Sequence, residues 1–220
     1  KALQPAIRFA KDQCLDLPPV MYQTRLIPLT PQADKYYKQL KKEMLINAGE
    51  ESVTAVNAAA GMNKLLQISG GAVYTDNHET IEFDISPRLN ALMEVLNETD
   101  HLNEKGVSSE IINGAVSASK RASIISQFQL SEDPRVLVIQ PQAASHGVTL
   151  TAADTVVFWG PVMSVEVYLQ CIARIDRVGQ ENKMTVVHLQ GSDVEKRMYA
   201  MLQGKVDAHT KLVDLYREEL

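Results

Sequence analysis

The sequence predicts an α/β protein with a parallel sheet flanked by helices and an N-terminal, mostly helical extension. The first observation is three continuous apolar runs, at Val136–Ile139, Val156–Trp159 and Met184–Leu189. Strands that are covered on both faces of a parallel sheet are apolar throughout, whereas half-exposed strands alternate. The second observation is that these runs alternate with helical segments at Ser117–Phe128 and Ser164–Ile175, which is the order of βαβ units.

The first hundred residues are expected to be mostly helical. Two of their helices begin with a good start signal, a capping residue followed by proline, at Thr30-Pro31 and at Ser86-Pro87. The segments expected outside the core of the sheet are a strand at Met21–Leu29, helices at Asp34–Leu45, Ala55–Ile68 and Arg88–Leu96, and a long helical region at Asp193–Tyr216 that is interrupted at Gly204.

Composition and length fit one sizeable domain with appended elements. The chain has 220 residues, of which 45% are hydrophobic, enough to fill a core. We divide it into a helical lead-in and connecting region, residues 1–100, and an α/β domain with C-terminal helices, residues 101–220. No apolar run approaches the roughly 18 residues of a membrane span, and no signal peptide opens the chain.

Cysteine usage and charge restrict the setting further. Cys14 and Cys171 are far apart and have no metal-ligand spacing, which favours a reduced, cytoplasmic location. The net charge of −5 argues against a generally basic nucleic-acid coat. A local basic groove stays compatible with this charge, because steering depends on where the charges lie.

Two arginines near the end of the Ser164–Ile175 helix carry the strongest chemical signal. Gln170, Arg174 and Arg177 follow one side of the helix at spacings of four and three. Arginine carries a planar fork of donors that suits phosphate oxygens, and open α/β sheets bind ligands at the carboxyl ends of their strands. The pair therefore indicates phosphate chemistry. The alternative is a salt-bridged helix end with Asp176, where positive charge complements the helix dipole.

These residues also carry a family resemblance. The run QCIARIDRVGQ (170–180) resembles the sixth motif of the Swi/Snf-type ATPases of helicase superfamily two, with a glutamine, two arginines and a closing Gly-Gln at the same spacing. Asp176 stands where that family most often has histidine, and Thr149 where it commonly has asparagine. Four other stretches also resemble parts of this family. The fifth motif is resembled by ASHGVTLTAADTVVFW, and the segment before it by INGAVSASKRASIISQF. The lead-in to the second RecA-like lobe is resembled by LPPVMYQTRLIPLTPQADKYYKQL, and its connecting helix by NKLLQISGGAVY.

The resemblance implies that this chain is the second RecA-like lobe of an ATP-dependent DNA translocase or helicase-like protein. The sequence has neither a G-x-x-x-x-G-K-[ST] phosphate loop nor a paired acidic motif, and in the family both belong to the first lobe. ATP and magnesium would be held mainly by that lobe, and this chain would be inactive alone. It would supply catalytic Arg174, Arg177 and Gln170, nucleotide-binding Gly147 and Gln180, and no metal ligand.

The resemblance also implies a part of a groove for DNA, expected to be duplex. Gly114, Ser117, Lys120, Ser145 and Thr149 are the candidates for holding one strand, by contacts that position the protein without reading sequence. The second hypothesis is a stand-alone nucleic-acid-binding or regulatory module without ATPase activity, and a solvated helix face explains Lys120 equally well. A dinucleotide enzyme is disfavoured, because no G-x-G-x-x-G follows a strand.

One part of the family pattern is missing. In the family, a strand and the start of a helix lie between a helix like Leu89–Leu96 and a segment like LNEKGVSSEIINGAV. Here His101 runs straight into Leu102, so about fifteen residues are lacking by typical element lengths. Either these residues are deleted from the protein, or they are present in the molecule and the numbering skips them.

Overall fold

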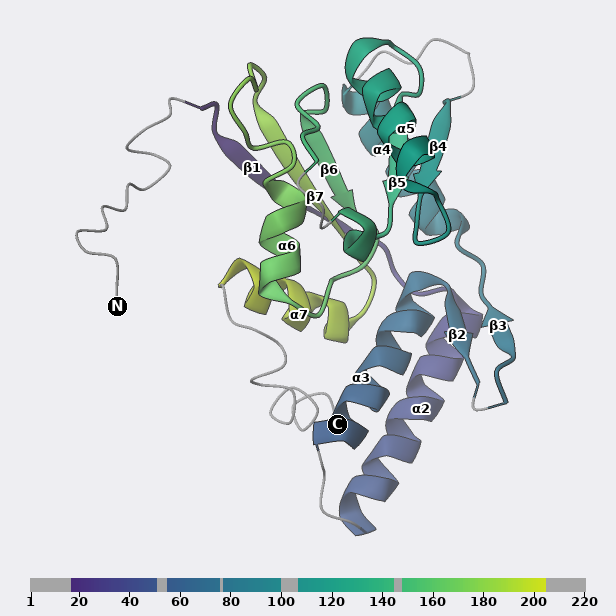
Figure 1. Ribbon diagram of the computed structural model, residues 1–220. Coiled ribbons are helices and arrows are strands. Elements are labelled where there is room, and N and C mark those ends of the chain that lie inside the picture. The colour runs from purple at the N-terminus through teal and green to yellow at the C-terminus, as the bar shows by residue number, and fades with distance from the viewer. Residues whose placement is uncertain (1–16, 51–54, 76, 100–106, 145–147, 205–220) are drawn as a thin grey trace, which may run out of the picture.

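The computed structural model describes residues 17–50, 55–75, 77–99, 107–144 and 148–204 (Figure 1). Its strands are β1 (Val20–Leu26), β2 (Ala72–Tyr74), β3 (Thr80–Glu82), β4 (Ser109–Ile112), β5 (Val136–Ile139), β6 (Thr155–Phe158) and β7 (Met184–Gln190). Its helices are α2 (Pro31–Glu50), α3 (Ala55–Gly70), α4 (Ser86–Thr99), α5 (Ala118–Leu130), α6 (Val165–Ile172) and α7 (Asp193–Gln203), with a 3-10 turn η1 (Pro141–Ala144).

The expected parallel sheet is confirmed. β7 lies between β1 and β6 and pairs with both in parallel, with Val20 opposite Met184 and Thr155 opposite Thr185. β4 and β5 form a second parallel pair. The middle strand β7 is the most deeply buried, since Val186 and Val187 are both fully buried, and this explains its continuous apolar run.

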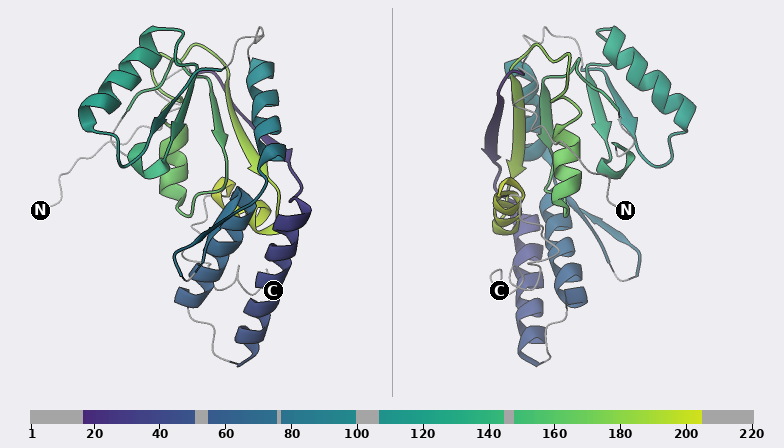
Figure 2. Two further views of the ribbon diagram at one scale, coloured as in Figure 1. Left: turned by 90° about the vertical axis from the view of Figure 1, so that its right-hand side faces the viewer. Right: turned by 60° about the vertical axis from the view of Figure 1, so that its left-hand side comes forward.

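Helices cover both faces of the β1-β7-β6 sheet (Figures 1 and 2). α6 and α7 pack on one face through Tyr168, Ile172, Tyr199 and Leu202, which contact Phe158 and Val186. α4 packs on the other face through Ala91 and Val95, which contact Ile27, Val187 and Leu189. α5 packs on β4 and β5 through Ile124, which contacts Ile112. It lies on the same side of these strands as α6 does of β6. The fold is therefore a helix–sheet–helix sandwich, as a RecA-like lobe requires.

The helices α2 and α3 form an antiparallel hairpin that extends away from the sheet (Figure 1). Tyr37, Met62 and Leu65 pack in its core, and Val194 and Met198 of α7 join the same cluster. The expected N-terminal helical extension is thus confirmed, and α7 connects it to the sheet.

A small antiparallel hairpin of β2 and β3 follows α3, and the sequence analysis did not identify it. Each of its strands is only three residues long, too short to produce a periodic pattern. Gly71 marks the turn before it, with φ +112° and the Ile85 side chain 2.1 Å from where a Cβ would lie. Only glycine fits there.

Helix starts were predicted better than helix ends. α2 begins at Pro31 and α4 at Ser86, as their start signals indicated. α6 ends at Ile172 instead of Ile175, because the backbone turns before the arginines. α7 ends at Gln203 with Gly204 as its C-cap, and the rest of the helical region expected up to Tyr216 lies outside the described residues.

The proposed boundary near residue 100 stays a prediction, and His101–Leu102 lies outside the described residues. β1 from the first part pairs along its length with β7 from the second part, and α4 packs on the same sheet. Both parts therefore contribute to one core. In the described ranges, no helix is both long and apolar enough to cross a membrane.

Candidate functional site

The two arginines of the sixth-motif segment lie in consecutive turns after α6. The backbone oxygen of Arg174 accepts a 2.9 Å hydrogen bond from the N–H of Leu150, which ties the turn to the segment before β6. Ile175, between Arg174 and Arg177, packs against Met184, the first residue of β7. Since α6 runs back along the sheet from the end of β6, the arginines lie at the amino ends of the strands, not at the carboxyl ends as expected.

Both guanidinium groups converge on one backbone carbonyl. Nη1 of Arg174 donates to the oxygen of Val148 at 3.3 Å, and Nη1 of Arg177 donates to the same oxygen at 3.4 Å. Nη1 of Arg177 also donates to Oγ1 of Thr149 at 2.8 Å. Arg174 is buried, and within the described part of the chain its Nε has no hydrogen-bond partner. Two positive charges and a spare buried donor therefore gather beside the 148–149 segment.

Cys171 lies one turn before these arginines but is not a nucleophile of this site. Burial raises the pKa of its thiol, and the positive charge of Arg174 opposes that rise. The net direction is upward, so the thiol stays protonated at neutral pH, and the protonated form is a poor nucleophile.

The two glutamines of the motif have different surroundings. Nε2 of Gln170 donates to Oε1 of Glu166, one helical turn earlier, at 3.0 Å. Gln180 is buried, and its Nε2 donates to backbone oxygens of Thr151, Ala153 and Ile175. Gln180 therefore connects the turn that holds the arginines to the segment before β6, and its nucleotide-binding role stays a prediction.

Three of the DNA candidates lie together at the opposite end of the strands from the arginines. Gly114 follows β4, and its N–H donates to Oε1 of Gln140, which follows β5, at 3.3 Å. Ser117 caps α5 and accepts a hydrogen bond from the N–H of Lys120, whose side chain is exposed. This cluster is at the carboxyl ends of β4 and β5.

The structure thus separates the DNA candidates into two groups. Thr149 lies beside Arg177, whereas Gly114, Ser117 and Lys120 lie at the opposite end of the strands. Ser145 and Gly147 lie outside the described residues.

A buried ion pair that the sequence analysis did not identify links α4 to α7. Nη2 of Arg88 donates to both carboxylate oxygens of Glu195, at 2.6 and 2.7 Å, and the two side chains are 5% and 0% exposed. Arg88 also donates to the backbone oxygen of Trp159 at the end of β6. Glu195 accepts from the N–H groups of Gly191 and Ser192 as part of a capping box. The pair holds the carboxyl ends of β6 and β7 to two helix starts.

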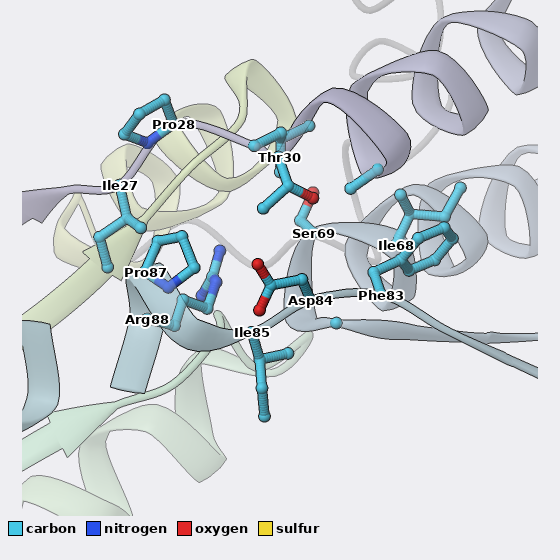
Figure 3. A pocket seen from close by; sticks show the side chains of 13 residues that line it. Ile27, Pro28, Thr30, Ile68, Ser69, Phe83, Asp84, Ile85, Pro87 and Arg88 are labelled. Atoms are coloured by element: carbon cyan, nitrogen blue, oxygen red, sulfur yellow. The ribbon is translucent and has the colours of Figure 1, made fainter. Parts of the chain in front are cut away.

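A small pocket opens next to this ion pair (Figure 3). In Figure 3 the side chains of Asp84 and Arg88 point toward one another, and Thr30 and Ser69 lie beside them. Hydrogen bonds from Ser86 lower the pKa of Asp84, so its carboxylate is charged at neutral pH. None of the site residues expected from the sequence lines this pocket.

Known proteins with a similar sequence include helicases and helicase-like proteins. Residues 72–179 match the helicase conserved C-terminal domain. The chromodomain-helicase-DNA-binding protein 1-like of Mus musculus is 27% identical over 71% of this chain and 17% of its own length. The DNA annealing helicase and endonuclease ZRANB3 of Mus musculus is 32% identical over 50% of this chain and 10% of its length. The chain spans less than a fifth of either relative.

The fold comparison agrees with the sequence comparison. The C-terminal part of the Fun30 ATPase domain has a TM-score of 0.68 to this chain, with 15% identity, and the match covers 93% of this chain and 97% of that one. At this identity the likeness concerns the fold, and it extends over the lobe and its helical extension together. The match to the helicase conserved C-terminal domain, the relatives and the shared fold together support a C-terminal, second RecA-like lobe of a Swi/Snf-type ATPase of helicase superfamily two.

Proposed function

We propose that this lobe completes an ATP-hydrolysing site whose phosphate loop and magnesium ion lie in a first RecA-like lobe of the same protein. ATP bound to the first lobe draws the two lobes together, so that Arg174 and Arg177 face the transferring phosphoryl group. Their charges stabilise the negative charge that develops there in the transition state. Hydrolysis releases the closed state, and repeated closure moves the protein along DNA.

The observation that carries this proposal is the convergence of the two guanidinium groups on the Val148 oxygen. A weak bond of 3.3 or 3.4 Å to a neutral carbonyl is readily exchanged for a charge-assisted bond to phosphate, which is shorter and about twice as strong. Arg177 is the more exposed of the two. We therefore assign Arg177 the direct phosphate contact, while Arg174 adds charge and holds the 148–150 segment.

The other expected site residues have supporting roles in this proposal. Gln180 keeps the arginine turn against the segment before β6, and Gln170 lies in α6, just before the arginine turn. Gly147, outside the described residues, stays a proposed nucleotide-binding residue.

The DNA part of the proposal assigns the phosphate backbone of a duplex to the exposed groups of the lobe. Ser117 and Lys120 lie at the start of α5, where the helix dipole and the N–H groups favour an anion. At Gly114 nothing lies within 4 Å of where a Cβ would be, so a phosphate can approach its backbone from that side. Thr149, beside Arg177, would contact a strand nearer the nucleotide, and Ser145, outside the described residues, stays a further candidate. The names of two relatives include DNA binding and DNA annealing, which supports a DNA substrate.

Arginine variants of the two-lobed protein test the catalytic part. Arg177→Ala should lower kcat for ATP by about 10³–10⁵, the range for arginine fingers, while KM for ATP changes little, since the finger acts on developing charge. Arg174→Ala should also lower kcat, with some loss of stability, because Arg174 is buried.

Arg135→Ala is the matched control, since Arg135 is an exposed arginine at the start of β5, and it should keep full turnover. An unchanged kcat in both Arg177→Ala and Arg174→Ala would mean that the two arginines have only a structural role after α6.

A further inference from the structure

The turn between β4 and α5 (Figure 1) contains Asn113-Gly114, the only Asn-Gly pair in the sequence. In such a pair the backbone nitrogen of the glycine has easy access to the side-chain amide of the asparagine, because glycine has no Cβ to block the approach. Asn113 is exposed. At Gly114 nothing lies within 4 Å of where a Cβ would be, so the neighbouring residues leave space for a ring to close between the two.

Hydrogen bonds hold the side chain of Asn113 over the backbone of Gly114. Oδ1 of Asn113 accepts a 3.0 Å hydrogen bond from the N–H of Ala115, and the ring of atoms that this bond closes includes both Cγ of Asn113 and the nitrogen of Gly114. The backbone oxygen of Asn113 accepts from the N–H of Val116 at 3.2 Å, which closes a β-turn on the same residue. Oδ1 becomes negatively charged when Cγ is attacked, and a donor at this oxygen stabilises that charge.

The attacking nitrogen is weakly restrained. The N–H of Gly114 donates to Oε1 of Gln140 at 3.3 Å, longer than the usual range of about 2.7–3.2 Å. Gln140 is itself exposed. Hydroxide from the solvent therefore reaches this N–H, and the bond to Gln140 holds it little.

We propose that Asn113 is a site of spontaneous deamidation. Hydroxide takes the proton of the Gly114 N–H, and the nitrogen forms a bond to Cγ of Asn113. The bond from Cγ to Nδ2 breaks, and the side-chain nitrogen takes a proton from water and leaves as ammonia. Water then opens the succinimide ring at either of its two carbonyls. The product is aspartate, or isoaspartate with the main chain running through the side-chain carbon, and the balance is one water consumed and one ammonia released.

The new carboxylate changes the charge of the DNA-holding turn, a consequence that rests on the proposed function. In that function Gly114, Ser117 and Lys120 hold DNA phosphates at the start of α5. A carboxylate on residue 113 repels those phosphates, and the positive end of the helix attracts it in their place. Deamidation therefore lowers the affinity of the lobe for DNA.

Peptide mass mapping of the 220-residue chain tests the chemistry, after incubation at mildly alkaline pH in water enriched in a heavy oxygen isotope. The peptide with Asn113 should take up heavy oxygen at least about tenfold faster than the peptides with Asn77 and Asn182, two exposed asparagines outside helices and strands that precede residues with side chains. Gly114→Ala, which has space for its Cβ, should slow the uptake at Asn113 by at least about tenfold. The inference is overturned if Asn113 reacts no faster than Asn77 and Asn182, or if Gly114→Ala reacts as fast as wild type.

Duplex DNA binding tests the consequence. Asn113→Asp carries the charge of the product, and it should bind about two- to fivefold more weakly than wild type at low salt and less so at high salt. Asn77→Asp adds the same charge in the turn between β2 and β3 and should bind like wild type. If Lys120→Ala lowers the affinity but Asn113→Asp does not, the consequence is overturned. If Lys120→Ala also leaves the affinity unchanged, the proposed DNA surface is wrong, and the mass mapping still decides whether Asn113 is modified.

Discussion

Acidification should destabilise this lobe through one buried histidine, His188 in the middle of the sheet. Its side chain is 1% exposed and stacks on Tyr199 with 4.2 Å between ring centroids. Nε2 lies 3.0 Å from the hydroxyl of Tyr168, and Nδ1 is buried with no hydrogen-bond partner among the residues that the structure describes. A protonated imidazole would need acceptors for two N–H groups, so burial lowers the pKa of His188 from 6.5 to about 4.

The sign and size of the effect follow from this difference in pKa. Between about pH 6.5 and about pH 4, the unfolded chain binds a proton at His188 and the folded chain does not, so stability falls as pH falls. At about 1.4 kcal/mol per pKa unit, a difference of about 2.5 units costs about 3 kcal/mol of folding free energy at the acid end.

Denaturant unfolding of wild type and of His188→Gln at several pH values across this window measures the effect. The difference in unfolding free energy between the two should shrink by about 3 kcal/mol from neutral pH to about pH 4. His78→Asn, an exposed histidine at φ 62° that asparagine tolerates, is the control and should track wild type. Parallel curves for wild type and His188→Gln would refute the reasoning.

Three further predictions concern the ion pair, a glycine and DNA. Glu195→Ala should lower the free energy of unfolding by about 3–5 kcal/mol, since it leaves a buried guanidinium unpaired, whereas exposed Asp193→Ala in the same helix turn should lower it far less; equal losses would contradict this. Gly191→Ala should destabilise by more than about 1 kcal/mol, because a Cβ there would lie 2.4 Å from a backbone oxygen, while Gly114→Ala, with nothing within 4 Å, should not; thermal unfolding of both decides. The isolated chain should bind duplex DNA weakly, and log K should fall with log salt by about 0.9 per neutralised phosphate, which gives a shallow slope. Lys120→Ala should lower the affinity for two unrelated duplexes equally. Tight, salt-insensitive binding to one duplex would show that the lobe reads bases.

Local signals in the sequence predicted the elements of this fold well. The capping residue and proline at Thr30-Pro31 and Ser86-Pro87 act within one helical turn, and both helices start there. The apolar run at Met184–Leu189 reports burial on both faces, and it became the central strand of its sheet.

Contacts between distant residues could not be predicted in this way. Arg88 and Glu195 are 107 residues apart, and the sequence around either residue does not indicate its ion-pair partner. The candidate site was also only partly predictable. Spacing placed Arg174 and Arg177 together, but their position at the amino ends of the strands depends on where α6 ends.

The central claim is that this lobe is one half of a split ATP-hydrolysing site. Phosphate release with magnesium, ATP and duplex DNA should be measured for the 220-residue chain alone, for a first lobe alone, and for the two lobes joined in one polypeptide. We predict no activity above background for this chain, little for the first lobe, and DNA-stimulated hydrolysis for the joined protein that Arg177→Ala abolishes. DNA-stimulated hydrolysis by this chain alone, or full activity of the joined protein without Arg174 and Arg177, would contradict the account.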